Sequence, residues 1–346
     1  MNIFIAANNG EIGGGEVMLL NIARALRALG HSVTVLGPAQ PDELIEAARD
    51  EGFSTVSLPA VNRKAYMVQL RAWYAQNRDG LLWCNGLVPA LATAGYKNRI
   101  VHLHQLPQGS QRHAYRLARR GARRVLVPSH FVAGRLPGTH VFENWVRETE
   151  QPLSQPSVQT PVRIGFLGRP SPLKGTHTLA HAVAQLNRQS THLRYRLVVA
   201  GTAKFIDGSD QERMQQAFTE LGEDVEMLGW VTPEQLFATS DILVVPSEVE
   251  ESFGLVATEA MSARQPLIVS DAGALPEVVG ENYAWVFRQG SVDELASSIE
   301  KLTQLLRSEP QAVWDQLTEN YWRWHEAYSP QAGQERVRRT LQKLES

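Results

Sequence analysis

Residues 247–259, SEVEESFGLVATE, connect a short apolar run at 242–245 to a segment of helical character at 256–263. The run has the composition of a buried strand, so the stretch predicts a strand that turns through a loop into a helix. The first N–H groups of such a helix lack intrahelical partners and favour an anion. Glu251 lies near the loop tip, and Glu259 follows about two turns along the helix. Carboxylates so placed can bind paired hydroxyls at the two ends of one elongated ligand. For a lone glutamate, an acid at a helix start or on a solvated helix face is the more common explanation, and it is the alternative for Glu251 and Glu259.

The composition predicts a soluble globular protein with two domains. The chain has 346 residues, of which 43% are hydrophobic and 20% charged. This length suits two domains of about 150 to 200 residues. Cys84 is the only cysteine, which excludes an intrachain disulfide and a cysteine-rich metal site. The segment MNIFIAANNGEIGGGE (1–16) has no basic start and no long apolar core, so we expect no secretory signal and a cytoplasmic location.

The first part of the chain has the pattern of a parallel α/β domain. Residues 2–7 and 31–37 predict strands, and the apolar positions of 16–29 recur at helical spacing between them. Ligands of such domains bind at the carboxyl ends of the strands. Gly13, Gly14 and Gly15 do not form the G-x-G-x-x-G fingerprint, which argues against a nicotinamide cofactor. These glycines would let the backbone approach a pyrophosphate, although a tight turn without a ligand is the plain alternative.

A histidine follows one of the next predicted strands. Apolar runs at 80–84 and 100–103 predict strands, and His104 comes directly after the second. This position is the ligand-binding end of a parallel sheet. His102 lies two residues earlier on the same sheet face and is the rival candidate. A structural histidine remains the alternative for both.

A second α/β pattern begins after a proline-containing segment, RETEQPLSQPSVQTPV (147–162), which we interpret as an interdomain linker. A strand at 164–167, the loop GRPSPLKG (168–175), a helix at 176–189 and a strand at 195–200 follow in order. Arg169 and Lys174 are the cations of the loop, which is where phosphate-binding cations belong. Surface charges without a ligand are the alternative. A further strand is expected at 225–231, and the aromatic-rich residues 310–346 predict helices.

Several segments resemble the retaining glycosyltransferases of GT-B fold, specifically the GT4-type family, or glycosyltransferase group 1. SEVEESFGLVATE resembles the family's E-x7-E element, and GRPSPLKG is similar to its G-R-x3-x-K-G segment. GGGEVMLLNIARALRALGHSVTVL (13–36) is similar to its opening segment, and IVHLHQLP (100–107) to its strand ending in an active-site histidine. DAGALPEVVG (271–280) resembles its G-x-P-E segment. VFENWV (141–146) resembles its N-G-V element with Trp145 in place of glycine, which leaves Asn144 an open candidate.

The resemblance implies two Rossmann-like domains facing each other across a cleft. Residues 1–146 would form the acceptor-binding domain, joined by the C-terminal helix at about 330–346. Residues 147–162 would be the linker, and 163–329 the nucleotide-sugar-binding domain. The aromatic residues of the C-terminal helices would then pack in the core and between domains.

The resemblance also implies transfer of a hexose, with retention, from a UDP- or GDP-linked sugar. Arg169 and Lys174 would hold the diphosphate, Glu259 the ribose, and Glu251 and His104 the donor sugar. The remaining expected contacts, several of them through the backbone, are Gly14, Gly15, Gly168, Gly229, Trp230, Ser252, Phe253, Gly254 and Leu255. The chain shows no Asp-x-Asp pair, so we expect a metal-independent reaction without a cofactor. The acceptor stays open among a glycan, a lipid-linked and a small-molecule acceptor.

Two alternatives remain at this point. The same architecture hosts nucleotide-sugar 2-epimerases, which need no acceptor. A nucleotide-sugar-binding or membrane-docking module without activity is the non-enzymatic alternative.

Positive charge is concentrated in one region. Residues 57–135 hold 13 Lys or Arg and one acid, a balance of +12, so the remainder of a chain that sums to −2 carries −14. Arg112, Arg116, Arg119 or Arg120, and Arg123 recur at helical spacing and predict one basic helix face. In 62–78, Arg63, Lys64, Arg71 and Arg78 alternate with Tyr66, Met67, Trp73 and Tyr74, as in an interfacial helix. An anionic membrane at the inner face of the cell is one expected partner, and a solvated face the alternative. Nucleic acid is not expected because no nucleic-acid-binding module accompanies the charge.

Overall fold

A computed structural model describes residues 1–150, 157–202 and 208–345. The chain divides into two compact units, Met1–Trp145 with Tyr328–Ser346, and Val146–Ala327. The first is called unit 1 below and the second unit 2. This division assigns residues 147–150 and 157–162 of the expected linker to unit 2, and the linker positions 151–156 lie outside the described residues.

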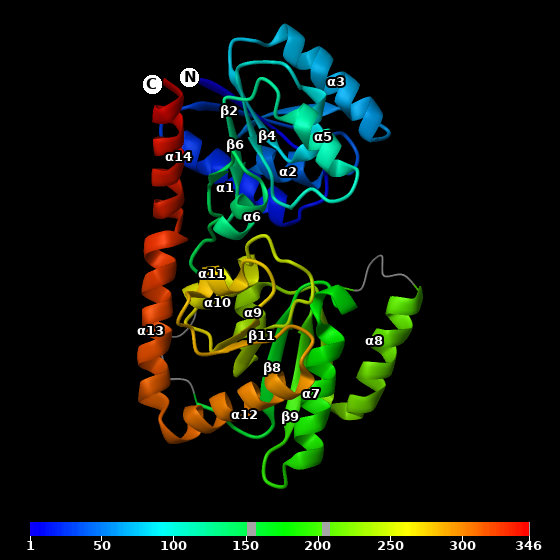
Figure 1. Ribbon diagram of the computed structural model, residues 1–346, viewed down its shortest axis with the longest axis vertical. Helices are drawn as coiled ribbons and strands as arrows, with labels where there is room; N and C mark the ends of the chain where they lie inside the picture. Colours follow the sequence, from blue (N-terminus) through cyan, green and yellow to red (C-terminus); the bar gives the residue numbers. More distant parts are fainter. Residues whose placement is uncertain (151–156, 203–207, 346) are drawn as a thin grey trace. The chain divides into compact units, whose positions relative to one another are not determined.

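Unit 1 is a parallel sheet with the strand order β3-β2-β1-β4-β5-β6-β7 (Figure 1). Its strands are β1 (Asn2–Ala6), β2 (Ser32–Pro38), β3 (Ser54–Leu58), β4 (Leu81–Asn85), β5 (Arg99–His102), β6 (Arg124–Val127) and β7 (His140–Val141). Its helices are α1 (Gly14–Ala28), α2 (Glu43–Asp50), α3 (Arg63–Gln76), α4 (Leu87–Ala92), α5 (Gln111–Ala118), α6 (His130–Arg135) and α14 (Pro330–Glu345).

Both faces of this sheet are buried, because successive side chains of a strand point to opposite faces. In β1, Ile3 and Ile5 join a core cluster that includes α1 and α14. Phe4 and Ala6 join the cluster on the other face, which includes residues of α3, α4 and α5. Helix α14 packs beside α1, so the end of the chain completes the core of unit 1 (Figure 1).

Unit 2 repeats the parallel α/β plan with the strand order β10-β9-β8-β11-β12-β13. Its strands are β8 (Val162–Leu167), β9 (Tyr195–Ala200), β10 (Val225–Gly229), β11 (Ile242–Val245), β12 (Leu267–Ser270) and β13 (Val286–Phe287). Its α-helices are α7 (Thr176–Gln189), α8 (Gly208–Leu221), α9 (Pro233–Phe237), α10 (Leu255–Ser262), α11 (Leu275–Val279), α12 (Val292–Ser308) and α13 (Pro310–Ala327). Two short 3-10 helices are η1 (Pro172–Lys174) and η2 (Gly222–Asp224). The helix predicted at 176–189 and the strand predicted at 195–200 are confirmed.

The prediction of one basic helix face is wrong for its later residues, Arg120 and Arg123. Helix α5 ends at Ala118, so Arg120 and Arg123 lie outside it. Arg123 instead precedes β6 and donates to the carbonyl of Leu344. A guanidinium here caps the C-terminal end of α14, where unpaired carbonyls favour a cation.

The expectation that the tyrosines of α3 serve as interfacial side chains is also wrong. Tyr66 and Tyr74 are buried in the core of unit 1. The aromatic residues of the C-terminal helices differ in burial. Trp324 and Tyr328 are buried, whereas Trp322 is exposed. No helix in residues 1–150, 157–202 and 208–345 is long and apolar enough to cross a membrane.

Candidate functional site

Glu251 lies in the loop between β11 and α10, and the segment after β12 holds this loop in place. The Ala274 N–H donates to the Glu251 carbonyl at 2.8 Å. A Cβ at Gly273, whose φ is +65°, would stand 2.3 Å from that carbonyl oxygen, so glycine is required for this approach. The Ser270 hydroxyl donates to the Ser247 carbonyl at 2.7 Å. The glutamate is therefore presented by a loop tied to a neighbouring strand.

Lys174 and Glu251, which are 77 residues apart, are in direct contact. Lys174 Nζ lies 2.6 Å from Glu251 Oε1, and the Ser247 hydroxyl donates to the same oxygen at 2.6 Å. The loop after β8, which carries Lys174, and the loop after β11, which carries Glu251, approach each other closely at two places. The Glu248 N–H donates to the Leu173 carbonyl at 2.9 Å, and a Cβ at Gly175 would lie 1.8 Å from the Pro246 carbonyl oxygen.

The N-terminus of α10 forms the next part of the site. Gly254 precedes the helix with φ +115°, and a Cβ there would stand 2.6 Å from Leu275 Cδ2. Phe253 is buried, so its side chain belongs to the core. Ser252, Gly254 and Leu255 are half-buried. The first N–H groups of α10 have no acceptor within the helix and carry the positive end of its dipole.

Glu259 lies on α10 and is half-buried. Burial raises the pKa of its carboxyl to about 7, and the charge of Glu234 acts in the same direction. A carboxyl with such a pKa changes its protonation near neutral pH. As a carboxylate it accepts through both oxygens, whereas the protonated form keeps one acceptor oxygen and gains an O–H donor.

The other predicted residues of unit 2 lie in turns after β8 and β10. Gly168 donates to the Ala200 carbonyl at 2.9 Å, and Gly201 donates to the Gly229 carbonyl at 2.6 Å, which brings the two turns beside the end of β9. Arg169 is exposed, and no hydrogen bond or ion pair of its guanidinium occurs within the described part of the chain. Trp230 is 79% exposed, so it does not cap the core.

Sequence reasoning missed a buried cluster next to Lys174. The Thr178 hydroxyl donates to Glu248 Oε1, and His177 Nε2 lies 3.5 Å from the same oxygen. Burial lowers the pKa of His177, and the charge of Glu248 opposes that shift. Glu248 belongs to the quoted segment 247–259 and His177 to the predicted helix 176–189, but 71 positions separate them and no local pattern pairs them.

In unit 1, the predicted glycines and histidine meet. Gly14 and Gly15 are the first residues of α1, and a Cβ at Gly15 would lie 3.3 Å from His104 Cδ2. Asn85, at the end of β4, was not predicted and bridges the two. Its Nδ2 donates to the Gly15 carbonyl at 3.0 Å, and its Oδ1 lies 2.7 Å from His104 Nε2.

His102, the rival of His104, is fully buried. The two imidazole centroids are 4.3 Å apart, and the Trp83 indole donates to His102 Nδ1 at 3.4 Å. Burial lowers the pKa of His104 to about 4 and that of His102 well below its usual value. Both rings are therefore neutral at pH 7.

The residues around Asn144 are part of the core. Trp145 packs on α14, where a Cβ at Gly333 would stand 2.2 Å from Trp145 Cδ2. Asn144 is itself buried, and its Oδ1 has no hydrogen-bond partner among the described residues. Trp145 therefore attaches the C-terminal helix to unit 1.

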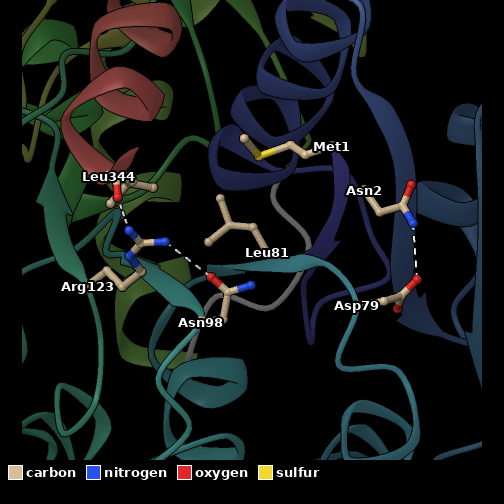
Figure 2. Close-up of a pocket in the computed structure, with 7 residues that line it drawn as sticks. All are labelled: Met1, Asn2, Asp79, Leu81, Asn98, Arg123 and Leu344. Carbon is tan, nitrogen blue, oxygen red and sulfur yellow. Dashed lines mark hydrogen bonds between the residues drawn. The ribbon is translucent and has the colours of Figure 1, made fainter. Parts of the chain in front are cut away.

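A cavity of about 210 Å³ lies where β1 and β4 begin, and Figure 2 shows the residues that line it. Arg123 donates to Asn98 Oδ1 at 3.4 Å and to the Leu344 carbonyl, and Asn2 donates to Asp79 Oδ2 at 3.1 Å. None of the predicted site residues lines it. Its polar side chains join strand starts to α14, which is a structural role.

Two family models match the chain. Residues 148–315 match Glycosyl transferases group 1, and residues 12–146 match Glycosyltransferase Family 4. The chain is 29% identical to the D-inositol 3-phosphate glycosyltransferase of Corynebacterium urealyticum over 225 residues, covering 62% of this chain and 49% of that protein. It is 30% identical to the lipopolysaccharide 1,2-N-acetylglucosaminetransferase of Salmonella typhimurium over 177 residues, covering 45% and 46%. The chain thus spans under half the length of these curated relatives.

The fold as a whole is similar to solved structures. Anabaena Alr3699/HepE in complex with UDP superposes with a TM-score of 0.84 at 23% identity, covering 99% of this chain and 100% of that one. At this identity the likeness shows the shared fold. The likeness to solved structures shows the GT-B fold. The two family models together match residues 12–146 and 148–315, so the chain belongs to the GT4-type, group 1 glycosyltransferases.

Proposed function

We propose that this chain transfers a hexose from a nucleoside diphosphate sugar to a hydroxyl group of an acceptor, with retention at the anomeric carbon. One observation carries the proposal: Lys174 Nζ lies against Glu251 Oε1 in the loop that leads into α10. A cation for a diphosphate, an acid for sugar hydroxyls and a helix N-terminus thereby occupy one place. Each favours a different group of the same ligand.

The charges suit the reaction. Cleavage of the bond between the anomeric carbon and the phosphate oxygen leaves negative charge on the diphosphate. Lys174, Arg169 and the N–H groups of α10 would stabilise that charge electrostatically. The acceptor oxygen forms the new bond on the same face, and its proton passes to the departing phosphate oxygen. Glu259 would bind the ribose and Glu251 the hexose. In unit 1, His104 would hydrogen-bond a sugar hydroxyl.

We further propose that the reaction needs no divalent metal and no cofactor. Lys174 and Arg169 supply two positive charges where other transferases use a cation. The test is transfer in excess EDTA, where full activity is expected. A strict requirement for added metal would contradict the proposal.

The relatives suggest which ligands to try first. Anabaena Alr3699/HepE was solved with UDP-glucose, and the Salmonella relative is named for transfer of N-acetylglucosamine to lipopolysaccharide. We therefore propose a UDP-linked donor and a glycan or lipid-linked acceptor. Neither choice follows from the contacts of the site alone.

The decisive experiment uses the purified chain. UDP-glucose, UDP-N-acetylglucosamine and GDP-mannose are screened by thermal shift, since a ligand that binds the folded state raises its Tm. The stabilising donor is then incubated with glycan and lipid-linked acceptors, and the anomeric configuration of the product is read by NMR. An inverted product would refute retention. An isomerised sugar from donor alone would indicate a 2-epimerase, and the absence of any stabilising donor would contradict the proposal.

We also propose that unit 1 docks on an anionic membrane at the cytoplasmic face. Val61 and Val68 are 92% and 69% exposed beside Arg63 and Lys64 on α3. Leu117 is 45% exposed on α5, which also carries exposed Arg112 and Arg116. Helix α4 contacts both α3 and α5. Figure 1 shows α3 and α5 in the same unit. Apolar residues among cations suit a lipid interface.

The membrane proposal is tested with vesicles. Arg63, Lys64, Arg112 and Arg116 are changed together to Glu, and sedimentation is measured with phosphatidylcholine vesicles with and without phosphatidylglycerol. Each cation contributes about 1 kcal/mol near an anionic surface, so binding to the anionic vesicles should be lost. Unchanged sedimentation of the variant would refute the proposal.

A further inference from the structure

We propose that Asn85 is a positioning residue that holds His104 as the neutral tautomer with its proton on Nε2, so that Nδ1 accepts a hydrogen bond from a sugar hydroxyl. Asn85 receives no role from the family resemblance. The role of His104 toward the sugar rests on the proposed function, whereas the tautomer depends only on unit 1.

The orientation of the Asn85 amide follows from its two partners. Its Nδ2 lies 3.0 Å from the Gly15 carbonyl, which can only accept a hydrogen bond. The amide oxygen must then face His104, where it lies 2.7 Å from Nε2. Rotating the amide by half a turn would place two carbonyl oxygens against each other, which costs the hydrogen bond and adds repulsion.

The orientation of the amide determines the tautomer of the imidazole. An amide oxygen accepts and does not donate, so Nε2 must carry the proton that bridges the two residues. In a neutral ring the other nitrogen, Nδ1, then has a lone pair and no proton. His104 is neutral at pH 7 because burial lowers its pKa to about 4.

Among the described residues, nothing competes for Nδ1 as an acceptor. Nδ1 is buried and has no hydrogen-bond partner in the described part of the chain. A buried acceptor without a partner is unfavourable, and a hydrogen bond from a ligand hydroxyl would satisfy it. The titratable neighbour is His102 of β5, whose ring centroid is 4.3 Å away and which burial also keeps neutral. It provides neither a proton nor a charge for Nδ1.

The arrangement has a consequence for donor choice. A neutral Nδ1 can accept a hydrogen bond from a hydroxyl. A carboxylate has no proton to donate, so it would place a second acceptor against Nδ1. The site should therefore prefer a neutral hexose to a hexuronic acid. A negative charge in place of Asn85 would reverse this preference, because a carboxylate beside Nε2 favours the imidazolium, whose Nδ1 carries a proton.

The first test is NMR of the ligand-free protein with ¹⁵N-labelled histidine. His104, assigned through His104→Asn, is expected as the neutral Nε2–H tautomer with no titration between pH 5.5 and 8. Asn85→Asp should raise its pKa into that range. Asn62→Asp is the matched control, since Asn62 caps α3 in the same unit and Asp caps equally well. An Nδ1–H tautomer in the unaltered protein, or an Asn85→Asp variant whose His104 does not titrate, would overturn the proposal.

The second test compares UDP-glucose with UDP-glucuronate. Asn85→Asp should lower the ratio of their kcat/KM values at least tenfold, and Asn62→Asp should leave it unchanged. An unchanged ratio in a folded Asn85→Asp variant would overturn the specificity role. If the unaltered chain turned over no nucleotide sugar, the proposed function would fail, whereas the NMR result would still decide the role of Asn85. Should Asn85→Asp not fold, the tautomer in the unaltered protein remains decisive.

Discussion

Lys174 and Glu251 neutralise each other in the ligand-free protein, so a diphosphate must share Lys174 with the carboxylate. The Lys174 side chain is 41% exposed, and ion pairs at such positions contribute about 0 to 1 kcal/mol. Drawing Nζ toward a phosphate therefore costs little. The Ser247 hydroxyl keeps Glu251 in place when the lysine moves.

Lys174→Ala should lower kcat by roughly 10²-fold, as expected when a charge-stabilising group is removed from a transition state. Steady-state kinetics with saturating donor measure this, and thermal denaturation should show little change. Lys301→Ala, on the exposed side of α12, is the matched control in the same unit. Near-normal kcat for Lys174→Ala would contradict the assigned role.

The ionisation of Glu259 predicts a pH dependence of donor binding. Its pKa is about 7 in the folded chain against 4.5 ordinarily, so the carboxylate that accepts ribose hydroxyls forms as the pH rises through 7. KM for UDP-glucose should fall about tenfold between about pH 6 and 8. The stability contribution has the opposite sign: it is full below about pH 4.5 and is lost as the pH rises through 7.

Comparing the pH dependence of KM in the unaltered chain and in Glu259→Gln separates the ionisation of Glu259 from that of other groups. The variant cannot ionise at this position, so its KM should be uniformly high and flat over the same range. A KM that does not change with pH in the unaltered chain would refute the assignment.

At the scale of elements, helix α14 packs closely against residues 143–145 at the end of the first part of unit 1. Gly333 lies against the Trp145 ring, and Arg336 pairs with Glu143 at 2.7 Å beside it. Trp145 also receives a hydrogen bond, since Asn21 Nδ2 of α1 donates to its carbonyl at 2.9 Å. Trp145 thereby joins α14 through its ring and α1 through its backbone carbonyl.

Gly333→Ala should destabilise unit 1 by about 1 to 3 kcal/mol, because overpacking displaces a buried ring. The measurement is the free energy of unfolding in urea, followed by tryptophan fluorescence. Gly134→Ala serves as control, since Gly134 lies in helix α6 of the same unit and an added Cβ meets nothing within 4 Å. Alanine favours a helix there, so stability should stay equal or rise. Equal stability of both variants would show that the Trp145 contact adapts without cost.

At the scale of the whole molecule, each unit has its own core, and unit 1 is built from two distant parts of the chain. Val337, Leu341 and Leu344 of α14 are buried in the cluster that contains Ile3 and Ile5. Unit 2 is a continuous segment.

Removal of residues 328–346 should therefore unfold unit 1 selectively. The loss of three buried aliphatic side chains costs roughly 1.5 to 3 kcal/mol each, which is a large part of the stability of a domain. Hydrogen exchange should rise throughout residues 1–145 and stay low in the strands of unit 2. Persistent protection of β1 and β4 in the shortened chain would contradict this dependence.

The sequence by itself determined the α/β class, the elements with strong periodicity, such as 176–189 and 195–200, and the motifs around Arg169, Lys174, Glu251 and Glu259. These properties are local, because hydrophobic spacing and turn residues act within one element. Tertiary structure alone decided which of the residues meet. Asn85 reaches His104 and Gly15 because β1, β4 and β5 are adjacent in the sheet although α1 to α3 intervene in the chain. Glu248 meets His177 for the same reason, since β8 and β11 pair across 75 residues of sequence or more. Strand order is set by burying both faces of each sheet at once, and no single segment carries that information.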